Sequence, residues 1–168
     1  MTSSDALSAL QAKLPELDWI TSKVHIKRLS RDFYWFSPML VPQLADKLAD
    51  LVVKPRNEAE LIALVSACVE LGVVMTVRGG GTGNYGQAVP LEGGVVIDMT
   101  ACTELQWLCD GLVRVQAGMS LRTLNWELDR LGLALPNLGD VDPQTVAGAI
   151  GTGTHGTGDR LHGIAKAV

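Results

Sequence analysis

Apolar residues recur along the chain with two different periods, and these periods predict alternating strands and helices. Short runs rich in valine at residues 51–55, 73–77 and 95–98 predict strands, and we expect the second of them to be buried. Another apolar run at residues 112–116 predicts a further strand. Between the first two runs, apolar residues return at helical spacing over residues 58–71, so the pattern indicates an α+β fold.

The helix expected at residues 58–71 carries signals at both of its ends. Asn57 and Glu60 form a capping-box pattern, in which Asn57 is the N-cap and Glu60 is the third helical residue. Gly72 follows the last apolar position and predicts a left-handed C-terminal residue. The predicted buried face consists of Leu61, Leu64, Val65, Cys68 and Leu71.

A second helix with the same kind of signals is expected after Ser120, which can cap it, and before Gly132, which can end it. Its predicted buried face consists of Leu121, Leu124, Leu128 and Leu131. A strand is predicted at residues 133–135, so the order helix, Leu-Gly, apolar strand and glycine-bearing loop occurs twice. Two copies are too few for a solenoid, and we interpret them as two similar units of one α+β domain.

Residues 1–44 form a lead-in of different character. Residues 5–17 predict a short amphipathic helix, and the basic stretch at residues 23–31 is interpreted as a solvated face. An aromatic cluster occupies residues 33–36, immediately before Pro38. It is either a packing plug or the mouth of a ligand site, and packing is favoured because aromatic side chains contribute strongly to protein cores.

Composition narrows the class of protein. The chain has 168 residues, 47% of them hydrophobic, and a net charge of −4, so neither nucleic acid nor an anionic membrane surface is an expected partner. The most apolar window, residues 61–77, contains Glu70 and Gly72 and predicts a helix and a strand rather than a membrane span. The three cysteines lack metal-ligand spacing, which predicts ordinary thiols in a reducing cytoplasm and no metal site.

A glycine-dense loop at residues 79–86 directly follows the second predicted strand. Glycine tolerates positive φ and lets successive backbone N–H groups point to one side, where they form a nest for a phosphate or pyrophosphate. Arg78 adds a positive charge at the end of the strand. A flexible turn is the alternative, but a turn needs fewer glycines than this loop contains.

This loop differs from two better-known phosphate loops. Gly81, Gly83 and Gly86 match the spacing G-x-G-x-x-G, but that fingerprint must open a helix. Pro90 and the following glycine pair leave no room for such a helix before the strand at residues 95–98. No Lys-Ser or Lys-Thr follows the glycines, so we expect a strand, nest and strand rather than a Rossmann or Walker loop.

A second glycine-rich stretch occupies residues 148–158, where small residues alternate with hydroxyl-bearing ones. We expect it to lie along an extended ligand. His155 is flanked by small residues, so a ligand-facing role and a structural or solvated role both stay open. Asp140 and Asp142 could cap or turn a loop as readily as contact a ligand. No nucleophile, metalloprotease or paired-carboxylate motif is found, so no catalytic residue is assigned.

These motifs together carry a resemblance. The first loop, from Arg78 to Asn84, is similar to the pyrophosphate loop of the FAD-linked oxidases of the vanillyl-alcohol oxidase and p-cresol methylhydroxylase superfamily. Residues 139–148 and 152–158 resemble the second flavin-contacting stretch of its sugar- and alditol-oxidising branch. Residues 29–44 resemble the lead-in of its glycolate- and D-lactate-oxidising branch.

The resemblance implies a PCMH-type FAD-binding fold of two α+β subdomains with FAD extended between them, here residues 45–168. Family members bind the pyrophosphate on the first loop and place the second stretch along the adenosine and flavin. The cofactor-binding residues implied for this chain are Arg78, Gly79, Gly80, Gly81, Thr82, Gly83, Asn84, Asp140, Thr145, Gly148, Thr152, Gly153, Thr154 and His155.

The sequence departs from the family pattern in two ways. Many members attach FAD covalently through a histidine in the first loop, whereas this chain has Thr82 there, so we expect non-covalent FAD. The substrate-binding domain that normally follows is not seen before Val168, so we expect a truncated or split protein in which a separate chain could hold the small-molecule substrate.

Three functions remain open from the sequence. The first is the FAD-binding part of an oxidoreductase that acts on a hydroxy acid or on a polyol or sugar. The second is a non-redox binding domain for another diphosphate ligand. The third is an assembly partner without a ligand, which two intact glycine loops disfavour.

Overall fold

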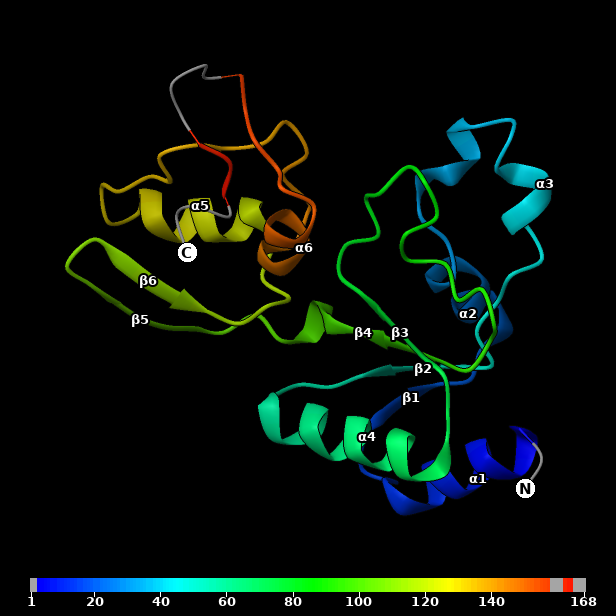
Figure 1. Cartoon of the computed structure of the whole chain (residues 1–168). Coiled ribbons are helices and arrows are strands. Elements are labelled where there is room, and N and C mark those ends of the chain that lie inside the picture. The colour runs from blue at the N-terminus through cyan, green and yellow to red at the C-terminus, as the bar shows by residue number, and fades with distance from the viewer. Residues whose placement is uncertain (1–2, 158–161, 165–168) are drawn as a thin grey trace. The chain divides into compact units, whose positions relative to one another are not determined.

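The chain divides into two compact units, Met1–Ala101 and Cys102–Val168, which are described separately (Figure 1). The computed structural model describes residues 3–157 and 162–164. Gly158 of the second glycine-rich stretch and the C-terminal residue Val168 therefore lie outside the described residues.

A four-stranded sheet in the order β1-β2-β4-β3 forms the centre of the first unit. Its strands are β1 (Asp18–Ile20), β2 (Leu51–Lys54), β4 (Val95–Asp98) and β3 (Met75–Arg78). Strand β1 is antiparallel to β2, whereas β2, β4 and β3 are parallel to one another. The strands predicted at residues 51–55 and 95–98 are confirmed.

Helices cover both faces of this sheet. On one face, α1 (Ser3–Lys13) and α4 (Glu58–Leu71) pack against the core that includes Val53, Val95 and Ile97 (Figure 1). On the other face, α2 (Lys23–Leu29) packs against Val52 and Val96. Successive residues of β2 and β4 thus point to opposite faces, as strand geometry requires, and both faces are apolar because both are covered.

The predicted ends of α4 are confirmed. The Asn57 side chain accepts a hydrogen bond from the Glu60 N–H at 2.9 Å, and Gly72 adopts a left-handed conformation with φ of 64°. The Glu60 carboxylate does not complete the capping box at Asn57. It accepts instead from the Arg56 N–H at 2.8 Å and pairs with the Arg56 guanidinium, one residue earlier.

The expectation that residues 73–77 form a buried strand is wrong in one respect. Strand β3 exists, but it is the edge strand of the sheet and its burial is partial. Val77 is 60% exposed, and among the described residues no strand pairs with β3 on its outer side. A valine-rich run alone did not distinguish an edge strand from a central one.

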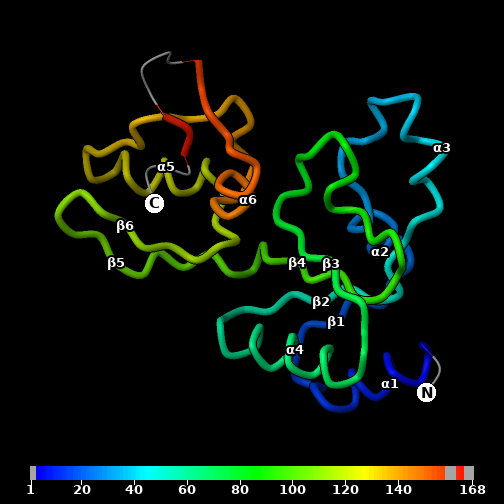
Figure 2. The backbone as a smooth tube through the Cα atoms, in the orientation of Figure 1, coloured from blue at the N-terminus to red at the C-terminus, as the bar shows by residue number. Residues whose placement is uncertain are grey.

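Residues 79–94 connect the parallel strands β3 and β4, and they contain no helix (Figure 2). This confirms the expected strand, loop and strand. The loop is tied to the short 3₁₀ helix η1 (Phe33–Phe36), because the Phe33 N–H donates to the Gly83 carbonyl at 2.7 Å. Two shorter elements complete this unit, α3 (Val41–Leu44) and η2 (Met99–Ala101).

The second unit contains a two-stranded antiparallel sheet and two helices. Strand β5 (Leu105–Cys109) pairs with β6 (Leu112–Val115), and the helices are α5 (Leu121–Asp129) and α6 (Val146–Gly151). The strand expected at residues 112–116 and the Ser120 cap of α5 are confirmed. Leu121, Leu124 and Leu128 are buried as predicted, but Leu131 is 60% exposed since α5 ends before it.

The predicted internal repeat is not reproduced. Residues 133–135 pair with no strand in the described part of the chain. Leu135 packs instead beside the apolar clusters around α5 and α6. Strand β5 escaped the sequence analysis, since Gln106 interrupts its apolar pattern.

Candidate cofactor site

Three neighbouring strands of the first unit each end in a charged residue. Lys54 ends β2, Asp98 ends β4 and Arg78 ends β3, so these side chains meet at the carboxyl edge of the parallel strands. Ligands of parallel α/β sheets bind at this edge. The edge therefore carries both charge and the start of the first glycine loop.

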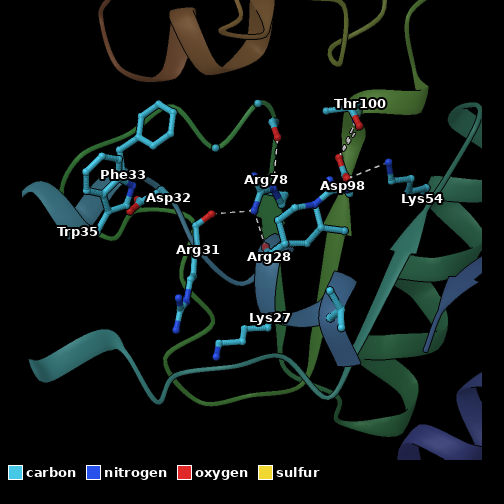
Figure 3. A pocket seen from close by; sticks show the side chains of 15 residues that line it. Lys27, Arg28, Arg31, Asp32, Phe33, Trp35, Lys54, Arg78, Asp98 and Thr100 are labelled. Atoms are coloured by element: carbon cyan, nitrogen blue, oxygen red, sulfur yellow. Dashed lines mark hydrogen bonds and ion pairs between the residues drawn. The ribbon is translucent and has the colours of Figure 1, made fainter. Parts of the chain in front are cut away.

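A cleft of about 710 Å³ lies at this edge (Figure 3). Its lining combines cations, two carboxylates, two aromatic rings and glycine backbone. The lining residues are Val24, Lys27, Arg28, Leu29, Arg31, Asp32, Phe33, Trp35, Lys54, Arg78, Gly79, Gly80, Gly81, Asp98 and Thr100. Five of these side chains are basic and two are acidic, so the cleft favours an anion.

Arg78 lies at the base of the glycine loop and is only 8% exposed. Its guanidinium donates to the carbonyls of Leu29 and Arg31, the latter at 3.0 Å from Nη1. Burial lowers the pKa of Arg78, while the nearby Asp98 and Asp32 carboxylates act in the opposite direction. Arginine stays protonated under such conditions, so it provides the fixed charge that the sequence predicted.

The first loop runs directly over this guanidinium. Gly81 has a φ of 65°, and a Cβ there would lie 1.9 Å from Nη2 of Arg78. Within the described part of the chain, the N–H groups of residues 79–84 have no protein acceptor. Unpaired N–H groups beside a buried arginine are the donors that a phosphate nest requires, and the nest itself stays a prediction.

The remaining residues of the first loop continue away from the cleft floor. Thr82 and Gly83 are half-buried, and Asn84 is exposed. Gln87 bends back under Gly83, because its Oε1 accepts from the Tyr85 N–H at 3.0 Å. The loop is thus braced by its own side chains as well as by η1.

Asp98 is the buried acceptor of the cleft. It is 1% exposed, and its Oδ1 accepts from both the N–H and the hydroxyl of Thr100, at 3.1 Å and 2.7 Å (Figure 3). Its Oδ2 lies 3.3 Å from Nζ of Lys54. This ion pair fixes the Lys54 ammonium at the edge of the cleft. Sequence analysis missed both residues, although each strand ending in a charge was a usable signal.

The expectation that the aromatic cluster packs internally is wrong for most of it. Tyr34 is buried, but Trp35 is 57% and Phe36 is 65% exposed, and these two rings stack on each other. Phe33 and Trp35 line the cleft, as the alternative interpretation proposed. The 3₁₀ geometry of η1 is the physical reason, since it turns only one of its four rings inward.

The basic stretch at residues 23–31 is exposed on its charged side, as expected for a solvated face. Lys27, Arg28 and Arg31 nevertheless lie along the cleft. Sequence analysis missed them because α2 approaches the glycine loop only in the folded unit.

In the second unit, the second glycine-rich stretch begins within a helix, to which the sequence analysis assigned no element. Thr145 is 3% exposed and caps α6, where its Oγ1 accepts from the Gly148 N–H at 3.2 Å. Gly148 therefore lies in the first turn of a helix.

The hydroxyls that follow α6 bind one another. Gln144 donates to Thr152 Oγ1 at 3.0 Å and accepts from Thr154 Oγ1 at 2.9 Å. Gly153 is left-handed with φ of 64°, and His155 is exposed, with Nδ1 3.1 Å from the Gly156 carbonyl. This network gives the stretch a defined local shape within the second unit.

The two aspartates preceding this stretch have different surroundings. Asp142 forms a two-point ion pair with Arg122, with both nitrogen–oxygen distances 2.8 Å. This hydrogen bonding lowers the pKa of Asp142 and raises that of Arg122. Asp140 is exposed. The sequence analysis did not anticipate the pairing of Asp142 with Arg122.

The residues of the cleft fit a diphosphate. Unpaired N–H groups, the buried Arg78 and the paired Lys54 lie at one edge of the sheet, and a Cβ on Gly81 would clash with the Arg78 guanidinium there. These are the donors that bind phosphate oxygens.

Comparison with known proteins places the chain in a family. The family described as FAD binding domain matches residues 49–168, and this chain belongs to it. Its fold is the PCMH-type FAD-binding fold of mixed helices and strands, and its cofactor is FAD.

Two curated relatives match similar portions of the chain. L-gulono-1,4-lactone dehydrogenase of Mycobacterium tuberculosis is 38% identical over 122 residues, which are 70% of this chain and 27% of that protein. D-lactate dehydrogenase of Archaeoglobus fulgidus is 36% identical over 120 residues, which are 71% of this chain and 27% of that protein. The chain thus spans about a quarter of the length of these relatives.

Solved structures share the fold at low sequence identity. An alkyldihydroxyacetonephosphate synthase superposes with a TM-score of 0.78 at 23% identity, covering 93% of this chain and 33% of that chain. A 4-ethylphenol oxidase from Gulosibacter chungangensis superposes with a TM-score of 0.70 at 18% identity, covering 88% and 28%. Among the described residues, no helix has the length and apolar character needed to cross a membrane.

Proposed function

We propose that this chain is the FAD-binding part of a flavin-dependent oxidoreductase. Its small-molecule substrate would be a hydroxy acid of the glycolate or D-lactate type, or a polyol or sugar. The names of the relatives support these two substrate classes. The observation that carries the proposal is the basic cleft, where the unpaired N–H groups of residues 79–84 lie above Arg78.

In this proposal the first loop binds the cofactor's diphosphate. The N–H groups of Gly79, Gly80, Gly81, Thr82, Gly83 and Asn84 donate to it, and the Arg78 charge lies beneath them. The second stretch contacts the rest of the cofactor through Asp140, Thr145, Gly148, Thr152, Gly153, Thr154 and His155. When bound, the flavin supplies the redox chemistry, and the protein supplies binding and position.

We further propose that FAD is held without a covalent bond. Thr82 occupies the loop position at which many family members carry the histidine that attaches FAD covalently. A threonine hydroxyl at neutral pH is a poor nucleophile. Substrate binding and the catalytic base would come from a further domain or a separate chain. We expect this chain to act in the cytoplasm and without nucleic acid, as its net charge of −4 and its cysteines suggest.

Reconstitution with FAD tests the proposal. The purified chain should turn yellow with a flavin absorbance spectrum, and acid precipitation should leave the colour in the supernatant. Anaerobic mixing with glycolate, D-lactate, alditols or L-gulono-1,4-lactone should leave the flavin of the isolated chain oxidised. Colour in the acid pellet would contradict non-covalent binding, and bleaching would contradict the need for a further domain.

A non-redox domain for another diphosphate ligand is the second candidate. It is favoured by the cleft itself, because its cations and N–H groups recognise a diphosphate in any nucleotide. Competition separates the two candidates. If a nucleotide sugar displaces FAD and binds at least ten times more tightly, the non-redox function is the correct one.

A further inference from the structure

Asp32 is a buried carboxylate that the protein satisfies on one side only. The residue is 4% exposed. Its Oδ1 caps η1 by accepting from the Tyr34 N–H at 2.9 Å. Its Oδ2 is buried and has no hydrogen-bond partner among the described residues. Buried polar atoms in native proteins are normally paired, so this oxygen indicates a missing donor.

The unpaired oxygen faces the first glycine loop. Asp32 lines the same cleft as Gly79, Gly80 and Gly81 (Figure 3). A Cβ on Gly83 would lie 3.4 Å from Oδ2. The Phe33 N–H donates to the Gly83 carbonyl at 2.7 Å, so the position of Asp32 relative to the loop is fixed by a hydrogen bond.

The negative charge of Asp32 determines which ligand groups can lie next to its carboxylate. A carboxylate repels phosphate oxygens, and it accepts hydrogen bonds from hydroxyl groups. In FAD the diphosphate is flanked on both sides by hydroxyl-bearing carbon chains, the ribose of adenosine and the ribityl chain of the flavin. A group that is acidic and adjacent to a diphosphate nest therefore suits the hydroxyls next to the diphosphate.

We propose that Asp32 is a cofactor-recognition residue that accepts a hydrogen bond from a sugar-type hydroxyl of the bound dinucleotide, next to its diphosphate. Gly83, the residue beside Oδ2, carries no side chain that would occupy the space next to this oxygen. The rings of Phe33 and Trp35 line the same cleft. This inference rests on the proposed FAD binding of the same cleft.

The variant Asp32→Asn tests the inference without removing the cap. Its amide oxygen can still accept from the Tyr34 N–H, while an NH₂ group replaces Oδ2 and can only donate. FAD binding to the full chain is followed by flavin fluorescence and by calorimetry. We expect the dissociation constant for FAD to rise roughly 5- to 10-fold, because the charge-assisted hydrogen bond from the hydroxyl is replaced at best by a weaker neutral one, in which the amide donates to the hydroxyl oxygen.

Asp46→Asn is the matched control, since Asp46 is exposed, lies outside the cleft and undergoes the same charge change. ADP distinguishes the two sources of the hydroxyl. If the ribose is the donor, Asp32→Asn weakens ADP and FAD equally. If the ribityl chain is the donor, FAD is weakened and ADP is not.

The inference is overturned if Asp32→Asn has the melting temperature of the parent and binds both FAD and ADP within about twofold of the parent's affinity. Should Asp32→Asn fail to fold, Asp32→Ser retains a capping hydroxyl and lacks the second oxygen. Loss of FAD binding in the parent chain would instead overturn the proposed function, so the two failures are distinguishable.

Discussion

The two glycine-rich regions of this chain resemble each other in sequence and differ in what they leave available. In residues 79–84, the described backbone N–H groups have no protein acceptor, and cations surround the loop. In residues 145–154, the Thr145 hydroxyl caps α6 and the Thr152 and Thr154 hydroxyls bind Gln144.

This difference separates a loop with unpaired backbone donors from a segment whose polar groups stabilise its own shape. Glycine content is common to both and therefore does not identify a binding nest. Unpaired donors are the more useful signal, because an N–H without a protein partner must be satisfied by a ligand or by water. The following substitutions test the contrast.

The largest effect is expected for Arg78→Gln. It leaves the Leu29 and Arg31 carbonyls without their donor in a buried site. We expect a loss of about 2–4 kcal/mol in the free energy of unfolding and at least a roughly tenfold weaker FAD affinity. Urea unfolding and a flavin titration measure the two quantities.

Arg114→Gln is the control for this substitution, because Arg114 is exposed on β6 in the second unit. It should change stability by less than about 0.5 kcal/mol. Equal stability of the two variants would show that Arg78 does not hold the loop.

The next effect compares one glycine from each region. Gly81→Ala forces a non-glycine residue into a left-handed conformation and against Arg78, so we expect a loss of about 1–3 kcal/mol and weaker FAD binding. Gly151→Ala places its Cβ in open space at the end of α6 and should stabilise by up to about 1 kcal/mol. Thermal and urea unfolding check both signs; a stabilising Gly81→Ala would contradict the assigned backbone constraint.

A smaller effect is expected for Thr145→Ala, which removes the cap of α6. The free energy of unfolding should fall by about 1 kcal/mol, and Thr145→Ser should restore it. We expect FAD affinity to change less than in Gly81→Ala, because the Thr145 hydroxyl already accepts a hydrogen bond from the Gly148 N–H of α6. A larger affinity loss than that of Gly81→Ala would reverse the contrast between the two regions.

The smallest effect is expected for Arg122→Gln, which breaks an exposed ion pair. Arg122 lowers the pKa of Asp142 below its ordinary value of about 3.9. The pair therefore stabilises the fold above that pH, and its contribution is lost as the pH falls through the lowered pKa. The melting temperature of the variant should lie slightly below that of the parent at pH 7, and the difference should vanish in strong acid.

Local pattern predicted those features that depend on residues close together in the chain. Asn57 and Glu60 are three residues apart, and the Asn57 cap was predicted correctly, although the Glu60 carboxylate accepts from the Arg56 N–H instead. The valine runs of β2 and β4 and the absence of a helix in residues 79–94 followed from the same kind of reasoning. In each case, the residues that form the element, or that prevent a helix, lie close together in the sequence.

Prediction failed where a residue's environment depends on distant partners. Residues 133–135 have a strand-like composition but pair with no strand in the described part of the chain, and Trp35 is exposed because η1 turns it outward. Val77 looked buried because its neighbours are apolar, whereas the sheet order places it at an edge.

The sequence by itself determined the α+β class, the two strands joined by a helix-free loop at residues 79–94, and the FAD-binding resemblance of the first loop. Only the tertiary structure decided which groups surround that loop. Arg78 and the Leu29 carbonyl are 49 residues apart in the chain and joined by a hydrogen bond. A donor is free or paired according to what the fold brings beside it, and no local pattern contains that information.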